Sequence, residues 1–257
     1  MIMFPISFGP MTWKTLALLI IFAVAPASAA ADQADEPPPP PLEVSYDRGE
    51  VLPLGLRAER GESAFVTVDG GYDGARKAGR FDATAEVHIV GPLYLRGGAT
   101  YVSSDDEVKP TVGALLQLFS SDGFSGAVGV FYKPEGLTEP EGEIEGTFAL
   151  GLRLERTTLV ANFTYGQDGE GTERDGEVRL GGTYRVARRV YVGADSRVRF
   201  SLGSEKAGEP DYDVIAGPLA TVVAFNMAFT AQAGISAVKI GGTDVGPIML
   251  IGVGRIF

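Results

Sequence analysis

The chain has 257 residues, of which 45% are hydrophobic and 21% are charged, a balance that excludes a disordered, highly charged polypeptide. Its formal net charge of −11 argues against a nucleic-acid-binding protein, because such proteins depend on a basic surface. Cysteine is absent and His88 is the single histidine, so the composition excludes disulfides, thiolate metal sites and multi-histidine sites.

The N-terminus has the pattern of an export signal. Lys14 precedes an apolar run over residues 16–24, and Ala-Ser-Ala at 27–29 is a small-residue cleavage site. The run is shorter than the roughly 20 apolar residues that a transmembrane helix needs. We therefore expect residues 1–29 to be a signal peptide, with Met11 as an alternative start. An N-terminal membrane anchor is the competing interpretation.

A proline-rich segment follows the expected cleavage site. Residues 37–41 are five consecutive prolines, which favour a stiff polyproline II rod without internal hydrogen bonds. We interpret residues 30–62 as a linker and lead-in. The part from 42 onward is either a lead-in to the folded domain or a short plug.

From Ser63 onward the apolar residues recur with a period of two, which predicts β-strands. Phe81, Ala83, Ala85, Val87 and Ile89, for example, alternate with polar residues. Most of the expected strands have about ten residues, a length that suits a tilted strand across a bilayer. The twelve expected strands cover residues 63–69, 80–90, 93–103, 110–119, 123–132, 143–155, 158–165, 176–186, 190–201, 212–223, 226–238 and 246–257.

The expected connections alternate between short turns and longer, polar, glycine-rich loops. The turns fall at 90–92, 120–122, 156–157, 187–189 and 224–225, and the loops at 70–79, 104–109, 133–142, 166–175, 202–211 and 239–245. One end of the sheet should therefore carry turns and the other loops. Acids are concentrated in three loops: Asp105, Asp106, Glu107, Glu135, Glu139, Glu141, Asp168, Glu170, Glu173 and Asp175.

Aromatic residues gather near both ends of the expected strands. On the outward face, one group should lie beside the loops: Phe81, Tyr101, Tyr132, Tyr165, Phe200 and Tyr212. A second group should lie toward the turns: Phe124, Tyr184, Phe229 and the terminal Phe257. Two such belts are typical of proteins whose strands cross both membrane–water interfaces.

An export signal, alternating strands and a terminal Phe257 together resemble the Gram-negative outer-membrane β-barrel proteins. The resemblance covers residues 63–257 and concerns architecture. It implies an all-β fold, a transmembrane antiparallel up-and-down barrel of about twelve strands, with ten possible. It also implies short periplasmic turns, external acidic loops, contact with outer-membrane lipid and lipopolysaccharide, and recognition of the last strand by the barrel-assembly machinery. Arg255 departs from the apolar residue usual at its position. A soluble lipocalin-like barrel or β-sandwich is the alternative fold, with the apolar face turned inward.

The polar face of the barrel should carry a cluster of lumen charges. With a turn at 90–92, Glu86 lies opposite Arg96, and with a turn at 187–189, Glu177 lies opposite Arg199. The second register also places Arg179 opposite Arg197, with Asp195 diagonal to Arg179. A two-residue turn at 156–157 would place Arg153 opposite Val160. The expected lumen cluster is Glu86, Arg96, Arg153, Glu177, Arg179, Asp195, Arg197 and Arg199.

Two functions fit such a lumen. The charges can set the selectivity of a narrow channel or small-solute binding barrel, or they can be structural ion pairs in a closed, surface-exposed barrel. A membrane-embedded hydrolase would depend on His88, which lies near a turn with no serine expected opposite it. We therefore expect no enzyme, no cofactor and no defined metal site, apart from loosely bound divalent cations at the acidic loops.

Overall fold

The computed structural model describes residues 64–104, 107–121, 123–134, 142–169, 171, 173–203, 211–225, 227–240 and 242–256. The expected signal peptide, the proline-rich linker and Phe257 lie outside these ranges. Twelve strands are formed within them: β1 (Ala64–Asp73), β2 (Ala78–Val90), β3 (Leu93–Val102), β4 (Glu107–Ser121), β5 (Phe124–Pro134), β6 (Gly142–Arg153), β7 (Thr157–Asp168), β8 (Arg174–Ala187), β9 (Val190–Ser201), β10 (Tyr212–Ala224), β11 (Met227–Ile240) and β12 (Gly242–Ile256).

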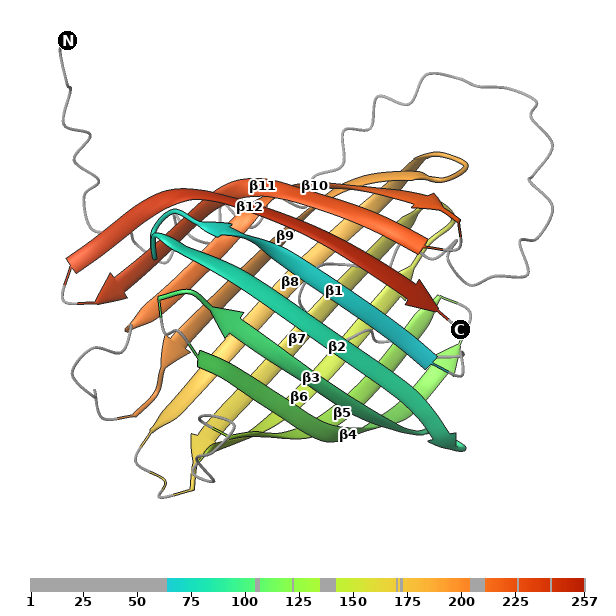
Figure 1. Ribbon diagram of the computed structural model, residues 1–257. Helices are drawn as coiled ribbons and strands as arrows, with labels where there is room; N and C mark the ends of the chain where they lie inside the picture. Colours follow the sequence, from blue (N-terminus) through green and yellow to red (C-terminus); the bar gives the residue numbers. More distant parts are fainter. Residues whose placement is uncertain are drawn as a thin grey trace, which may run out of the picture.

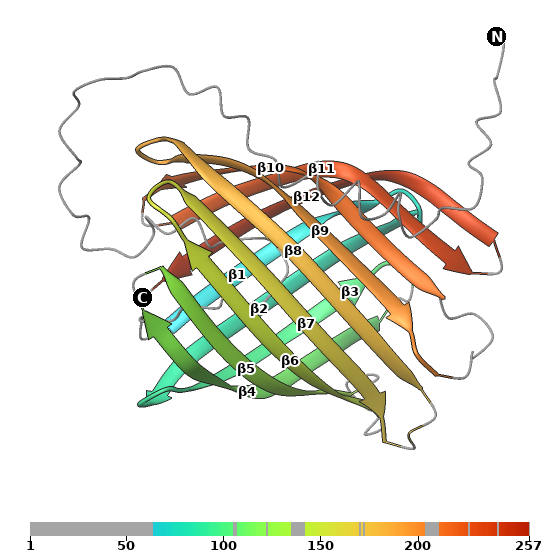
Figure 2. The same ribbon diagram turned by 180° about the vertical axis from the view of Figure 1, so that it is seen from behind.

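The strands close into a single barrel. Each pairs with its sequence neighbours, and β1 pairs with β12 to complete the cylinder. Every pairing is antiparallel, so the predicted up-and-down barrel of twelve strands is confirmed. Figures 1 and 2 show that the strands run obliquely to the barrel axis, as closure of a sheet requires. The described residues contain no helix that is long and apolar enough to cross a membrane.

Large apolar side chains cover the outside of the barrel. They occupy alternate positions on each strand, as the period of two dictates. Val87 is 47% exposed and Phe163 is 45% exposed, whereas Glu86 is only 2% exposed. The soluble alternative required the apolar face to point inward, and these residues have the opposite orientation. Other exposed apolar residues include Val68, Phe81, Leu95, Val112, Leu118, Val130, Ile144, Val192, Ile235, Met249 and Ile251.

The interior also contains apolar residues, which the sequence analysis did not assign to it. Tyr94, Leu115, Phe131 and Ala149 form one buried cluster along β3–β6. Ile215, Ile248 and Leu250 form a second cluster at β10 and β12. These side chains occupy space inside the cylinder and narrow the lumen on two sides.

Two of the loops expected from the sequence are instead tight turns. β1 continues to Asp73, so residues 74–77 are the whole connection to β2, and the expected loop at 70–79 is wrong. β11 and β12 run through the glycine-rich stretch 239–245 and pair up to Ile240 and Gly242. The loop expected there is also wrong, because glycine and polar residues at a strand end do not stop the ladder from continuing.

The turn between β6 and β7 differs from the prediction as well. It occupies residues 154–156, and Arg153 lies opposite Thr158 rather than Val160. The predicted register was two residues off because Leu154 continues the apolar alternation into the turn. A shift of two residues preserves the face of every side chain, so Arg153 still points inward.

The β1–β2 turn bends into the barrel mouth. The Gly74 amide donates to the Pro247 carbonyl at 2.7 Å, and the Ala75 amide donates to Ser236 Oγ at 3.2 Å. A side chain at Gly246 would collide with the backbone of Gly74 and Ala75, so glycine is required for this approach. In both views the β11–β12 hairpin projects beyond this turn, which lies against its inner face (Figures 1 and 2).

Candidate functional site

A buried ion pair joins β8 and β9 inside the barrel. Arg179 Nε donates to Asp195 Oδ1 at 3.0 Å, and Arg179 Nη2 donates to Asp195 Oδ2 at 2.5 Å. The two side chains are only 4% and 5% exposed. Their residues stand diagonally on adjacent strands, because Arg179 is paired with Arg197. The bidentate geometry explains how two arginines can face each other across this hairpin, since Asp195 neutralises one of them.

Arg197 belongs to a second network, which reaches the β1–β2 turn. Its Nη2 donates to Asp213 Oδ2 at 2.8 Å, and its Nε lies 3.9 Å from Glu177 Oε2. Arg76 Nη2 donates to the same Asp213 oxygen at 2.9 Å. One carboxylate on β10 therefore holds both the β9 wall and the inward turn, which are separated by more than a hundred residues of sequence.

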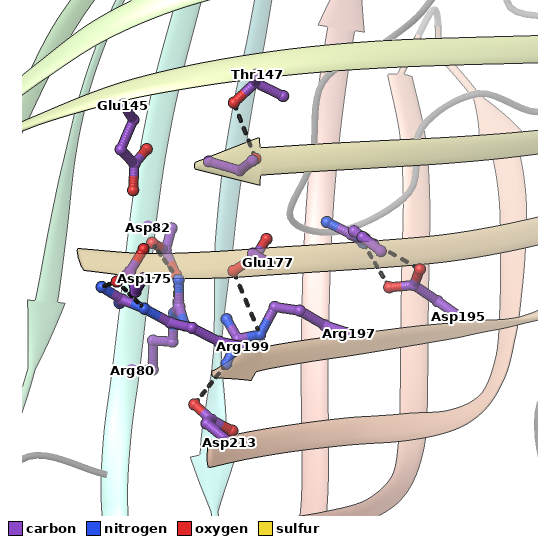
Figure 3. A network of polar contacts seen from close by, with 12 residues as sticks. Arg80, Asp82, Glu145, Thr147, Asp175, Glu177, Asp195, Arg197, Arg199 and Asp213 are labelled. Atoms are coloured by element: carbon purple, nitrogen blue, oxygen red, sulfur yellow. Dashed lines mark hydrogen bonds and ion pairs between the residues drawn. The ribbon is translucent and has the colours of Figure 1, made fainter. Parts of the chain in front are cut away.

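Nearby, Arg199 forms an ion pair with Asp175 on β8 and lies 3.7 Å from Glu143 Oε2 on β6. Asp175 is thus inside the barrel on β8, where the sequence analysis had placed it in an external loop. Figure 3 shows the Asp175, Glu177 and Asp213 carboxylates gathered around Arg199 and Arg197.

The wall made by β2, β3, β5 and β6 carries three further ion pairs. Arg80 Nε donates to Asp82 Oδ2 at 2.5 Å, and Thr100 Oγ1 donates to Asp82 Oδ1 at 2.6 Å. Arg96 Nη1 lies 3.4 Å from Glu86 Oε2. Lys133 and Glu145 form the third pair.

A cavity of about 190 Å³ lies between these walls. Its lining runs from β1 to β7 and includes Glu177 and Arg197 from the far side. Threonine hydroxyls and ion-paired side chains dominate this lining, with Phe65 and Phe131 at its edge. Such a polar interior is what a membrane barrel needs if water or a small solute enters it.

Most of the charges expected in the lumen are brought together by these networks. The structure places seven of the eight in ion pairs inside the barrel, namely Glu86, Arg96, Glu177, Arg179, Asp195, Arg197 and Arg199. Arg153 also faces inward but lies next to the β6–β7 turn. The pairings of Glu86 with Arg96 and of Glu177 with Arg199 are those the turn lengths predicted.

Several members of the site were missed from the sequence. They are Asp69, Arg76, Arg80, Asp82, Lys133, Glu143, Glu145, Asp175 and Asp213. Parity along each strand could have found those on β2, β6 and β8, because they share the inward face with residues that were assigned. No local signal connects Arg76 to Asp213.

The expected aromatic residues face outward. Phe81, Tyr132 and Tyr165 are exposed near the loop ends of their strands, and Phe124 is exposed at the turn end. Tyr101, Phe200, Tyr212 and Tyr184 are half-buried on the same outer face.

His88 lies at the turn rim of the barrel. Its Nε2 donates to the Gly91 carbonyl at 2.8 Å, and its ring is 5.0 Å from the ring of Tyr94. In this tautomer Nε2 carries the proton and Nδ1 keeps the lone pair; among the described residues the ring's contacts are with the Gly91 carbonyl and Tyr94, not with a serine. The described residues include no group of three or more His, Asp or Glu side chains arranged to hold a metal ion.

Comparison with known proteins identifies the fold only. No model of a known family matches the chain, and no curated protein matches it. Among solved structures, the NanC porin aligns with a TM-score of 0.54 at 10% identity, covering 74% of this chain and 97% of that one. The KdgM porin aligns at 0.53 with 8% identity, covering 75% of this chain and 99% of that one. An outer membrane channel from Pseudomonas putida F1 aligns at 0.53 with 12% identity, covering 80% of this chain and all of that one (100%). The chain therefore shares its barrel fold with these proteins.

Proposed function

We propose that this protein is an outer-membrane β-barrel that acts as a narrow channel or binding barrel for small solutes, without catalytic activity. The observation that carries the proposal is the distribution of side chains. Exposed apolar residues cover the outside, while ion pairs and hydroxyls line a cavity inside. The apolar outer surface can contact lipid, and the polar inner surface can contact water or a polar solute. The KdgM porin, which has the same fold, has been solved in complex with oligogalacturonate.

The proposed location includes several further expectations. Residues 1–29 would direct export, and the aromatic residues near the two rims would sit at the two membrane–water interfaces. The strand that ends in Phe257 would be recognised by the barrel-assembly machinery. The external acidic loops would face lipopolysaccharide and its divalent cations.

A closed structural barrel is the second candidate. The observation that favours it is the packing of the interior, where Arg179, Asp195, Thr221, Thr230 and Gln232 are all at least 95% buried. A twelve-stranded barrel lies between the filled eight-stranded and the open sixteen-stranded classes, so its size fits either function.

Planar-bilayer recording separates the two candidates. The channel proposal predicts discrete conductance steps from the purified wild-type barrel. It also predicts a shift of selectivity toward cations for Arg197→Glu, with a smaller shift for Arg197→Gln, because Arg197 lines the cavity. Absence of current from the wild type would favour the closed barrel. A current whose ion selectivity is unchanged in both variants would contradict the selectivity role of Arg197. Heat-modifiable gel migration of each variant verifies that it is folded.

A further inference from the structure

The cavity contains one carboxylate that the surrounding bases leave unmatched. Asp69 on β1 is 8% exposed and lies in the cavity lining. Among the described residues, no donor forms a hydrogen bond or an ion pair with its side chain. Its neighbour Asp82, directly opposite on β2, already bonds Arg80 and Thr100.

Each base of the lining lies in an ion pair with another acid of the lining, and Arg197 also bonds Asp213, which is outside the lining. The four bases that line the cavity are matched by the four remaining acids: Arg80 with Asp82, Arg96 with Glu86, Lys133 with Glu145 and Arg197 with Glu177. Asp69 is the fifth acid, so the lining has one more acid than it has bases, and Asp69 is the acid without an ion pair. A buried charge without a partner is costly, and a bound cation would remove that cost.

Three threonine hydroxyls line the same cavity as Asp69. Thr67 is two residues from Asp69 on the same face of β1, and Thr84 lies opposite Thr67 on β2. Thr111 lines the same cavity from β4. These three hydroxyls have no hydrogen-bond partner within the described part of the chain, so they are available to a solute.

The geometry points to a binding site for a small primary ammonium solute that carries hydroxyl groups, with Asp69 as its anchor. The ammonium would donate to the Asp69 carboxylate, and the threonine hydroxyls would hydrogen-bond the polar remainder of the solute. A volume of about 190 Å³ suits one small solute rather than a long oligomer. One unpaired carboxylate with neutral hydroxyls in the lining suits a singly charged ammonium, whereas a divalent Ca²⁺ or Mg²⁺ takes about six oxygen ligands in proteins. Transport of the bound solute through the barrel rests on the proposed channel function.

Three probes of nearly equal size test the charge preference: ethanolammonium, ethylene glycol and glycolate. Binding to the detergent-solubilised full chain is measured by saturation-transfer NMR, which does not require conduction. We expect ethanolammonium to bind more tightly than either other probe. Asp69→Asn should lower the affinity for ethanolammonium about tenfold, because a charge-assisted hydrogen bond is lost. Asp69→Glu should restore part of the binding.

Two further variants separate a specific anchor from a general loss of charge. Asp244→Asn removes one exposed acid of β12 and should leave binding unchanged. Gly252→Ala keeps the net charge, but its Cβ would meet Asp69 Oδ1 and displace the carboxylate, so binding should weaken. Preference for glycolate or ethylene glycol, or equal binding by wild type and a folded Asp69→Asn variant, would overturn the inference.

Planar-bilayer recording with the same probes keeps the two proposals distinguishable. A barrel that conducts without preferring ethanolammonium would retain the proposed channel and refute the site. A barrel that binds ethanolammonium through Asp69 but passes no current would retain the site and refute the channel.

Discussion

Loss of the Asp195 carboxylate should strongly destabilise the barrel. Asp195→Asn keeps the shape of the side chain but removes its charge and one of the two acceptors that Arg179 uses. Arg179 is 3% exposed, so its guanidinium would stay buried without a counterion. Breaking such a pair lowers the free energy of unfolding by about 3–5 kcal/mol. The amide oxygen of Asn can still accept one hydrogen bond, so the loss for Asp195→Asn should be about 3 kcal/mol.

The matching double substitution tests the physical reason. Replacing both partners, as Arg179→Met with Asp195→Leu, removes the unmatched charge as well as the ion pair. Buried pairs replaced in this way are often neutral in stability, so most of the loss should be recovered. The double variant should therefore be more stable than Asp195→Asn alone.

The free energy of unfolding is measured by denaturant titration in lipid vesicles, followed by circular dichroism and gel migration. Trp13, the one tryptophan, precedes the barrel, so its fluorescence would not report on the strands. Asp244→Asn is the control, because it removes an exposed carboxylate from β12. A change below about 0.5 kcal/mol for Asp195→Asn, the range of ordinary surface substitutions, would refute the assigned role of the pair.

Three further predictions concern the outer face, the mouth and the single histidine. Phe163→Arg places a charge on the outer face at the middle of β7 and should lower the free energy of unfolding in vesicles by about 2–4 kcal/mol. Thr164→Arg, on the lumen face, should lower it less. Equal losses in the two variants would contradict the orientation of β7. Arg76→Ser removes the hydrogen bond from the β1–β2 turn to Asp213 and should raise the single-channel conductance. Substitution of the exposed neighbour, Lys77→Ser, should leave the conductance unchanged. Equal conductance of the two variants would exclude the turn as a constriction. Wild type and His88→Ala should both fail to release fatty acid from phospholipid vesicles, because no described serine bonds the His88 ring. A hydrolysis that is lost on substitution would disprove this.

The number of strands and the orientation of their faces could be predicted from the sequence because both depend on local patterns. Alternation identifies the outward face of β2, and a short turn with Gly91 at φ 54° sets Glu86 opposite Arg96. The β6–β7 register failed where Leu154 extended the alternation beyond the strand. Its error of two residues left the faces correct, which is why Arg153 was still placed inside.

Contacts across the lumen could not be predicted in the same way. Hairpin register relates a residue only to its neighbours on adjacent strands. The bond from Arg76 to Asp213 depends on how far a four-residue turn bends inward over β12, and this in turn depends on Gly246. The unmatched charge of Asp69 also emerges only when every base of the cavity has been assigned to a partner.

The orientation of the two strand faces, apolar toward lipid and polar toward a water-accessible interior, can be measured directly on β2. The chain has no cysteine, so single cysteines can be introduced one at a time at Phe81, Asp82, Ala83, Thr84 and Ala85 of β2 in membrane-inserted protein. A small water-soluble maleimide should label positions 82 and 84 and spare 81, 83 and 85. Labelling without this alternation, or with the opposite phase, would contradict the account.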